Sequence, residues 1–238
     1  MYTHWWILVL GAAILLAYSV VYLLEWKHPN YLQSGHVHSA SKYRHGLIKL
    51  SISLLTGWLF ASYLWGISKL FPGLLHLLFP RIFLLRFLLG FALLDLTMYA
   101  WHRINHVYSA LWNYHRLHHE EKQLNVFSTF QFHPKEILLS TFWRLILLPL
   151  LGIEPAALLW YNTVFFSVIL FHHSNIRLSK SFDKLVASLI VSPDMHHVHH
   201  SVNIDESNSN YGSVFSFWDR IFRSHKTAKI RPITFGVS

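Results

Sequence analysis

The 238-residue chain contains no cysteine and few charged residues. The absence of cysteine excludes disulfide bonds, thiolate metal ligands, iron–sulfur clusters and cysteine nucleophiles. Charged residues make up only 13% of the chain and hydrophobic residues 53%, which is not the composition of a soluble domain. The 20 Lys and Arg outnumber the 11 Asp and Glu, but they flank apolar segments, so we expect no nucleic-acid partner. The composition predicts an integral membrane protein.

Long uncharged segments occupy the first half of the chain. Residues 5–24 form a run of 20 residues without charge, about the length that crosses a bilayer as a helix. A cleaved signal peptide is the alternative for this run, but no basic segment precedes it. A second uncharged run covers residues 50–68, and a third covers residues 82–101, interrupted by Arg86 and Asp95. All three predict membrane helices.

Two further apolar segments, residues 137–153 and 155–171, are each only 17 residues long. They either span the bilayer or form a kinked hairpin that re-enters on the same side. Lys and Arg are concentrated after the first run and in the C-terminal part of the chain, which predicts that both regions are cytosolic. We therefore expect an all-α, polytopic membrane bundle with a histidine-rich helical cap on its cytosolic face.

Histidine is the residue type present in excess. There are 19 histidines, more than all the carboxylates together, and eleven fall within residues 102–119 and 172–200. Residues three or four apart share one face of a helix, so the spacings HxxxH and HxxHH direct several imidazoles toward one point. These spacings occur at three places, namely His102 with His106, His115 with His118 and His119, and His196 with His199 and His200.

This pattern predicts a metal site. A neutral imidazole offers one lone pair to a cation and donates a hydrogen bond from its other nitrogen. Eight or more such ligands exceed the need of one ion, so two metal ions are implied, and residue types alone leave Fe, Zn, Cu and Ni open. If the clustered histidines bind no metal, they could instead cap helix ends, anchor the protein at the membrane interface or sense pH. A membrane protein that binds or transports metal without turnover and a zinc hydrolase are the functional alternatives.

The ordered motifs resemble the sterol desaturase and fatty acid hydroxylase superfamily of membrane-bound histidine-box di-iron oxygenases. Besides the three boxes, the resemblance rests on Asp95, Tyr99, Arg103, Trp112, Phe132-His133-Pro134, Glu136, His173-Ser174-Asn175, Pro193-Asp194-Met195, Ser201, Asn210-Tyr211-Gly212 and Phe217-Trp218-Asp219-Arg220. One departure is Arg223-Ser224, where the family often has Gly-Thr.

The resemblance also divides the chain. It implies one integral-membrane domain over residues 1–238, with membrane helices in residues 1–84, a catalytic region in residues 85–224 and a tail in residues 225–238.

The activity implied by the resemblance is O2-dependent hydroxylation or desaturation of an unactivated C–H bond in a lipid, such as a fatty acyl chain, a sterol or an ether lipid. It implies two Fe ions, with Zn a substitute in a purified or crystallised form. It also implies a lipid drawn from the bilayer and an external electron donor such as cytochrome b5, a ferredoxin or a reductase. We expect the bacterial inner membrane, with the endoplasmic reticulum as the alternative.

The resemblance implies nine metal ligands, His102, His106, His115, His118, His119, His173, His196, His199 and His200. Only one of the neighbours His172 and His173 is expected to face the metals, since they lie about 100° apart on a helix, and His173 fits the family pattern better. His133 is expected near the metals without binding them, and His197 as a polar residue of the cap.

Two carboxylates are expected to act as acceptors, Asp95 for a ligand imidazole or a buried water and Asp194 for a ligand imidazole. Asp95 lies seven residues before His102, on nearly the same helical face and two turns deeper in the membrane. Its alternative role is to pair with Arg86 or Arg144. Asp194 is expected to orient His196. Further along the chain, Asn210, Trp218 and Asp219 are expected to tie the tail to the cap.

Overall fold

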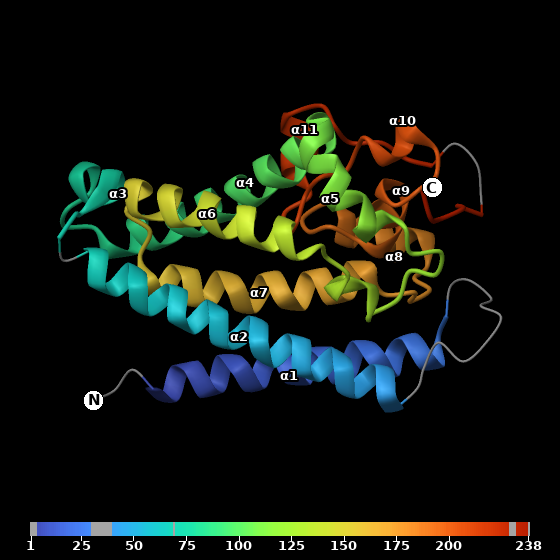
Figure 1. The fold of residues 1–238 in the computed structure, drawn as a ribbon, viewed down its shortest axis with the longest axis horizontal. Coiled ribbons are helices and arrows are strands. Elements are labelled where there is room, and N and C mark those ends of the chain that lie inside the picture. The colour runs from blue at the N-terminus through green and yellow to red at the C-terminus, as the bar shows by residue number, and fades with distance from the viewer. Residues whose placement is uncertain (1–3, 30–39, 69, 229–231, 238) are drawn as a thin grey trace.

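A computed structural model describes residues 4–29, 40–68, 70–228 and 232–237. Within these ranges the regular elements are helices, with only isolated β-bridges between loops, so the predicted all-α architecture is confirmed. The long helices run along the long axis of the molecule (Figure 1). They are α1 (His4–Lys27), α2 (Ala40–Ser68), α4 (Phe83–Val107), α6 (Pro134–Leu151) and α7 (Pro155–His173).

Shorter helices gather at one end of these long helices, where they form a cap (Figure 1). The cap consists of α5 (Ser109–His119), η1 (Ser128–Phe130), α8 (Lys180–Ala187), α9 (Pro193–His199), α10 (Ile204–Ser207) and α11 (Phe217–Ile221). At the opposite end lies α3 (Gly73–Leu78), which packs against α6.

Three helices are long and apolar enough to cross a membrane, judged by length and composition. They are the Val9–Lys27 part of α1, the whole of α4 and the whole of α7. Their outer sides carry exposed apolar residues such as Leu16, which is 65% exposed, and such side chains are stable against lipid tails rather than water. The chain is therefore a membrane protein.

The helices α6 and α7 follow one another in sequence but are not packed as a pair. The contacts of α6 are with α2, α3, α4 and α5, whereas α7 is central and packs against α1, α2, α4 and α9. A cavity is lined by residues of both α6 and α7. Of the two segments, α7 is long and apolar enough to cross a membrane. Whether the segments span the bilayer or form a kinked hairpin that re-enters it stays a prediction.

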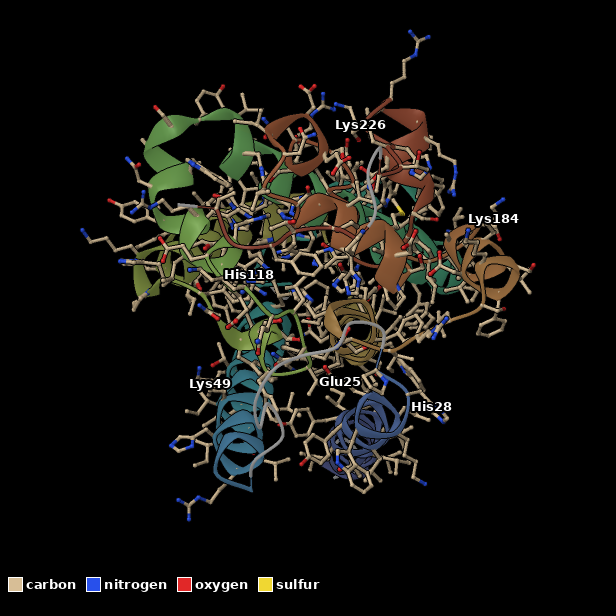
Figure 2. The ribbon with its side chains drawn as sticks, turned by 90° about the vertical axis from the view of Figure 1, so that its right-hand side faces the viewer. Glu25, His28, Lys49, His118, Lys184 and Lys226 are labelled. Atoms are coloured by element: carbon tan, nitrogen blue, oxygen red, sulfur yellow. The ribbon has the colours of Figure 1, made fainter. Side chains whose placement is uncertain are left out.

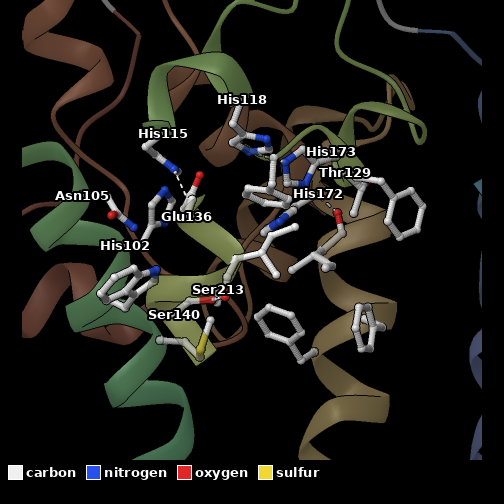
Figure 3. A pocket seen from close by; sticks show the side chains of 18 of the residues that line it. His102, Asn105, His115, His118, Thr129, Glu136, Ser140, His172, His173 and Ser213 are labelled. Atoms are coloured by element: carbon white, nitrogen blue, oxygen red, sulfur yellow. Dashed lines mark hydrogen bonds and ion pairs between the residues drawn. The ribbon is translucent and has the colours of Figure 1, made fainter. Parts of the chain in front are cut away.

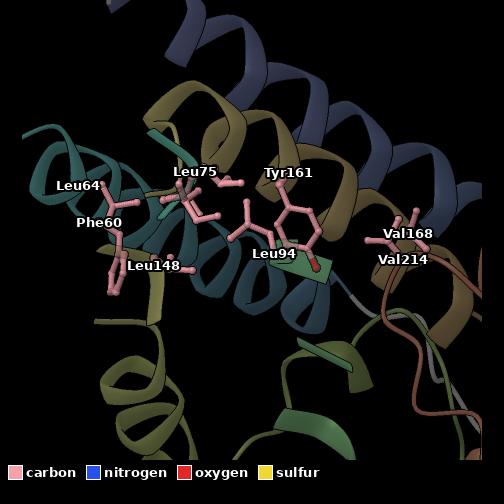
Figure 4. Close-up of a cluster of buried hydrophobic side chains, with 10 residues drawn as sticks. Phe60, Leu64, Leu75, Leu94, Leu148, Tyr161, Val168 and Val214 are labelled. Carbon is pink, nitrogen blue, oxygen red and sulfur yellow. The ribbon is translucent and has the colours of Figure 1, made fainter. Parts of the chain in front are cut away.

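Two apolar clusters hold the long helices together. The first joins α2, α3, α4, α6 and α7 through buried residues that include Leu64, Leu75, Leu94, Leu148 and Tyr161 (Figure 4). The second joins α1, α2 and α7 to the cap through Ile14, Tyr18, Val21, Leu50, Val126, Leu170 and Ile176. Burial of these side chains fixes which faces of α4 and α7 are directed toward the cap.

A buried carboxylate attaches the first helix to the cap. Glu25 is fully buried where α1 meets α7 (Figure 2). Its Oε2 atom accepts a hydrogen bond from the backbone N–H of Val126 at 3.0 Å, and its Oε1 atom accepts one from Asn175 at 3.1 Å. Hydrogen bonds to a charged acceptor are stronger than neutral ones, so this residue fixes the end of α1 against two cap segments.

We predict that Gly152→Ala destabilises the protein. Gly152 ends α6 at φ +71°, and a Cβ atom there would lie 2.6 Å from the carbonyl oxygen of Pro72 and 3.0 Å from Nδ1 of His76. The left-handed conformation is unfavourable for residues with a Cβ, so we expect a loss of about 1–3 kcal/mol in the free energy of unfolding. Thermal unfolding in detergent measures it. The control is Gly11→Ala, whose Cβ meets no described atom within 4 Å, and an equal loss in both variants would contradict the prediction.

Candidate metal centre

Nine histidines from α4, α5, α7 and α9 and the residue after α9 converge in two groups where the long helices meet the cap. In each group, one nitrogen from every residue lies within 4.8 Å of the corresponding nitrogens of the others. The first group consists of His102, His106, His115, His119 and His199. The second group consists of His118, His173, His196 and His200. These are the nine residues that the family resemblance implies as ligands.

Local structure explains how α4 and α5 meet. His102 and His106 lie one turn apart at the end of α4, and Tyr108 then breaks the helix with an extended conformation, φ −97° and ψ 116°. The chain reverses at this residue, so that α5 packs back against α4. As a result, the ring centroids of His102 and His115 are 5.0 Å apart, and those of His106 and His119 are 4.8 Å apart.

The short helix α9 supplies the third box. Ser192 caps its first turn by accepting a hydrogen bond from the backbone N–H of Met195, and Pro193 occupies the first helical position, as is typical of helix starts. The seven-residue helix then presents His196 and His199 on successive turns beside α7.

In the first group, backbone carbonyls determine which imidazole nitrogen carries the proton. Nδ1 of His102 lies 3.0 Å from the carbonyl oxygen of Tyr211, and Nδ1 of His199 lies 2.7 Å from that of Ser209. A carbonyl oxygen only accepts, so each Nδ1 donates and each Nε2 is left with its lone pair. Both Nε2 atoms are buried, and within the described residues neither has a hydrogen-bond partner. This is the state in which imidazole binds a metal.

The second group is a chain of close nitrogen contacts. Nε2 of His173 lies 3.0 Å from Nε2 of His118 and 3.1 Å from Nε2 of His196, which in turn lies 3.1 Å from Nε2 of His200. The single proton of His173 is on Nδ1, which donates to the carbonyl oxygen of Ile169 at 2.8 Å. Its one Nε2 lone pair cannot satisfy two neighbours, whereas a cation between the rings could accept lone pairs from all four.

Burial keeps the cap imidazoles uncharged. Desolvation, with smaller contributions from the neighbouring rings, lowers the pKa well below 6.5 for His118, His119, His196, His199 and His200. They are neutral at pH 7, as metal ligation requires. The residues present therefore fit two metal ions bound by nitrogen.

Three other histidines considered in the sequence analysis, His133, His172 and His197, lie outside both groups. His172 is buried with neither nitrogen hydrogen-bonded among the described residues, and its ring stacks on His196 with centroids 3.9 Å apart. His197 directs Nε2 to the carbonyl oxygen of Ser174 at 3.1 Å. The Nδ1 atom of His133 accepts a hydrogen bond from the backbone N–H of Lys135 and so caps α6. Of the two neighbours at the end of α7, His173 is therefore the one in a group.

The predicted contact between Asp95 and a ligand imidazole is wrong. Its Oδ1 atom accepts hydrogen bonds from the hydroxyl of Tyr161 at 2.8 Å and the backbone N–H of Val214 at 3.1 Å. Its Oδ2 atom accepts from the backbone N–H of Phe215 and the indole N–H of Trp218, both at 2.9 Å. Asp95 lies on the expected face of α4, but the C-terminal segment covers that face.

The alternative partners of Asp95 are also wrong. Arg86 donates from Nε to Glu154 at 2.7 Å, far along α4 from the cap. The guanidinium of Arg144 lies 5.4 Å from the ring centroid of Phe60. The orienting role of Asp194 stays a prediction, because the contact described for this residue is a backbone N–H donated to Asp183 at 3.4 Å.

Two carboxylates support the first group. Glu136 of α6 accepts a hydrogen bond from Nδ1 of His115 at 2.8 Å (Figure 3). Glu136 belongs to the motifs that carry the family resemblance, but the sequence alone indicated no role for it. Asp219 accepts from the backbone N–H groups of Tyr211 and Gly212, at 2.7 and 2.8 Å, and burial raises its pKa. It therefore fixes the segment whose carbonyl accepts from His102, as expected for a residue that ties the tail to the cap.

Beside the two groups lies a cavity of about 440 Å³, lined by residues of α2, α4, α5, η1, α6, α7 and α9. One side carries imidazoles, including His102, His118 and His172 (Figure 3). Most of the remaining wall is apolar, formed by Ile52, Met98, Trp101, Phe130, Phe132, Ile137, Phe165, Phe166 and Ile169. Such a space suits a hydrocarbon chain.

Comparison with known proteins identifies the class. The model of the fatty acid hydroxylase family matches residues 87–224, more than half of the chain, and the chain therefore belongs to this family. The chain is 32% identical over 133 residues to the ornithine lipid hydroxylase OlsE of Rhizobium tropici, a match that covers 56% of this chain and 39% of the relative.

A second relative is the human cholesterol 25-hydroxylase, 26% identical over 166 residues that cover 67% of this chain and 58% of the relative. The matches thus span less than two thirds of either relative. No solved structure matches the chain.

We predict that Glu136→Gln weakens metal binding about 10–100-fold, the usual effect of losing a partner that orients a metal-bound imidazole. The amide has no negative charge to hold the Nδ1 proton of His115. Competition with a chelator of known affinity measures the change. Glu120→Gln is the control, because Glu120 is partly exposed and contacts Arg116 at 3.5 Å rather than a histidine. Unchanged metal affinity in Glu136→Gln would show that this contact does not orient a ligand.

Proposed function

We propose that this protein is a membrane-bound lipid hydroxylase whose two histidine groups each hold one iron ion. The observation that carries the proposal is the contact between these groups and an apolar cavity, in a chain of the fatty acid hydroxylase family. The two relatives named above are lipid hydroxylases, which supports hydroxylation. Desaturation of the same C–H bond is the alternative outcome.

In this proposal the iron, the imidazoles and the apolar wall of the cavity have separate roles. Bound iron would supply the redox chemistry that inserts oxygen from O2 into an unactivated C–H bond. The imidazoles would hold the ions, and for His102 and His115 the Nδ1 atom donates to a fixed acceptor, the carbonyl of Tyr211 and the carboxylate of Glu136 respectively, which leaves Nε2 free for a cation. The apolar wall excludes water and holds the substrate chain beside the imidazoles. An all-imidazole ligand set contains no thiolate that the oxidant would attack.

Both acidic residues of the original site prediction have positioning roles in this proposal. Asp95 acts through the C-terminal segment that it binds, since this segment includes the carbonyl acceptor of His102. Asp194 lies in the first turn of α9 and acts on the orientation of His196.

The partners in this proposal follow from the apolar surface and the redox chemistry. The lipid substrate comes from the bilayer, and reduction needs an external donor such as cytochrome b5, a ferredoxin or a reductase. Basic residues near the helix ends support a cytosolic cap. We propose the bacterial inner membrane as the location, with the endoplasmic reticulum as the alternative.

Metal transport, the competing function, would need ligands distributed along the membrane helices. Instead, the ligands supplied by α4 and α7 lie in the last turns of these helices, and the remainder come from the cap. This distribution favours an ion held in one place.

We predict that His118→Ala abolishes lipid hydroxylation and lowers bound iron by about one ion per chain, because His118 belongs to the second group only. Elemental analysis and lipid mass spectrometry with an added electron donor measure the two effects. The control is His133→Ala, which removes an imidazole outside both groups. Full hydroxylation by His118→Ala would refute the ligand assignment. Equal lipid profiles from cells with and without the wild-type protein under oxygen would count against the activity.

A further inference from the structure

One basic side chain of the cavity wall is not used by the proposed chemistry. Arg144 lies in α6 and lines the cavity. Its Nε donates to the carbonyl oxygen of Ser140 at a long 3.4 Å, and its guanidinium lies 5.4 Å from the ring centroid of Phe60. In the described part of the chain, no carboxylate pairs with it. A guanidinium carries five N–H donors and keeps its charge, so most of its binding capacity remains unused.

The position of Arg144 relative to the histidines follows from helix geometry. Glu136, Ser140 and Arg144 are spaced by four residues and all line the cavity, so they lie along one side of α6. Glu136 contacts His115 of the first group. Eight residues of helix advance about 12 Å, so Arg144 lies about that far along α6 from the imidazoles.

The surroundings make an unpaired cation unfavourable. The cavity that Arg144 lines is also lined by Ile137, Phe165 and Phe166, and Phe60, whose ring lies 5.4 Å from the guanidinium, belongs to the apolar core. A charge in such a region is stable only with a partner, and intramembrane ionisable residues that line a cavity generally mark a ligand path. A guanidinium binds carboxylate and phosphate groups through paired hydrogen bonds.

We propose that the cavity binds an anionic lipid, with its carboxylate or phosphate on Arg144 and its hydrocarbon chain directed toward the histidines. This inference rests on the proposed function, since it specifies the substrate of the same cavity. It assigns Arg144 as the residue that recognises the charged group and thereby sets which carbon reaches the metal site. Lys49, which also lines the cavity and is exposed, adds positive charge on the side formed by α2.

The test is equilibrium binding to the purified holoprotein in phosphatidylcholine nanodiscs, without an electron donor so that no turnover occurs. The probes are palmitate, its uncharged counterpart hexadecanol, and dipalmitoyl phosphatidate. The variants are Arg144→Gln, which removes the charge, and Arg144→Lys, which keeps it. Arg116→Gln is the control, because Arg116 is exposed on α5 and contacts Glu120.

We expect wild type and Arg116→Gln to bind at least one anionic probe about tenfold more tightly than hexadecanol. This preference should disappear in Arg144→Gln and persist in part in Arg144→Lys. Preference for palmitate identifies a carboxylate ligand, and preference for phosphatidate alone identifies a phosphate ligand. Equal affinity of wild type for all three probes would overturn the proposal, even if Arg144→Gln fails to fold. So would an unchanged preference in folded Arg144→Gln.

Failure of the proposed function gives a different result. A protein without hydroxylase activity that still binds anionic lipid through Arg144 would refute the oxidation chemistry and leave this inference intact.

Discussion

A neutral imidazole has one donor and one acceptor nitrogen, and nine such rings share one buried space in this protein. On the outer side of this space, several rings donate to fixed acceptors, as in the hydrogen bonds from His199 to the carbonyl of Ser209 and from His173 to that of Ile169. On the inner side, Nε2 of His173 lies about 3 Å from Nε2 of both His118 and His196, and its one lone pair cannot satisfy both neighbours. A bound cation would remove this conflict, so the arrangement of the rings suits metal binding.

The outer acceptors are themselves held from inside the membrane bundle. Asp95, deep in α4, binds Val214, Phe215 and Trp218. Asp219 then binds the backbone N–H groups next to the carbonyl that faces His102. Asp95 and Asp219 thus influence the histidine groups through the backbone of the C-terminal segment, not through direct contact with an imidazole. Because these hydrogen bonds connect α4 to the acceptors of its own histidines, we expect a shift of α4 to move the histidines and their acceptors together.

Helical periodicity was sufficient to predict that the three histidine boxes converge, because the spacings of three and four residues are local and keep their meaning in any helix. His173 was predicted from the family resemblance instead. The same reasoning placed Asp95 on the correct face of α4 but assigned it the wrong partner. Periodicity shows which face a residue occupies, whereas the segment that covers this face is set by tertiary packing. The role of Glu136 and the contact of Glu25 with Val126 and Asn175 were missed for the same reason. Residues so distant in sequence leave no local pattern.

The proposed anchor at Arg144 would also account for how an apolar cavity selects one carbon of a lipid chain for oxidation. Apolar walls distinguish neighbouring methylene groups by only about 1–3 kcal/mol, and a flexible chain can slide along them. A polar contact at a fixed distance from the metals removes this freedom, because sliding by one carbon would break it. Since α6 carries both Glu136 and Arg144, one helix would set the distance between the proposed metal site and the proposed anchor. Position selectivity would then depend on the length of α6 between these residues more than on the shape of the wall.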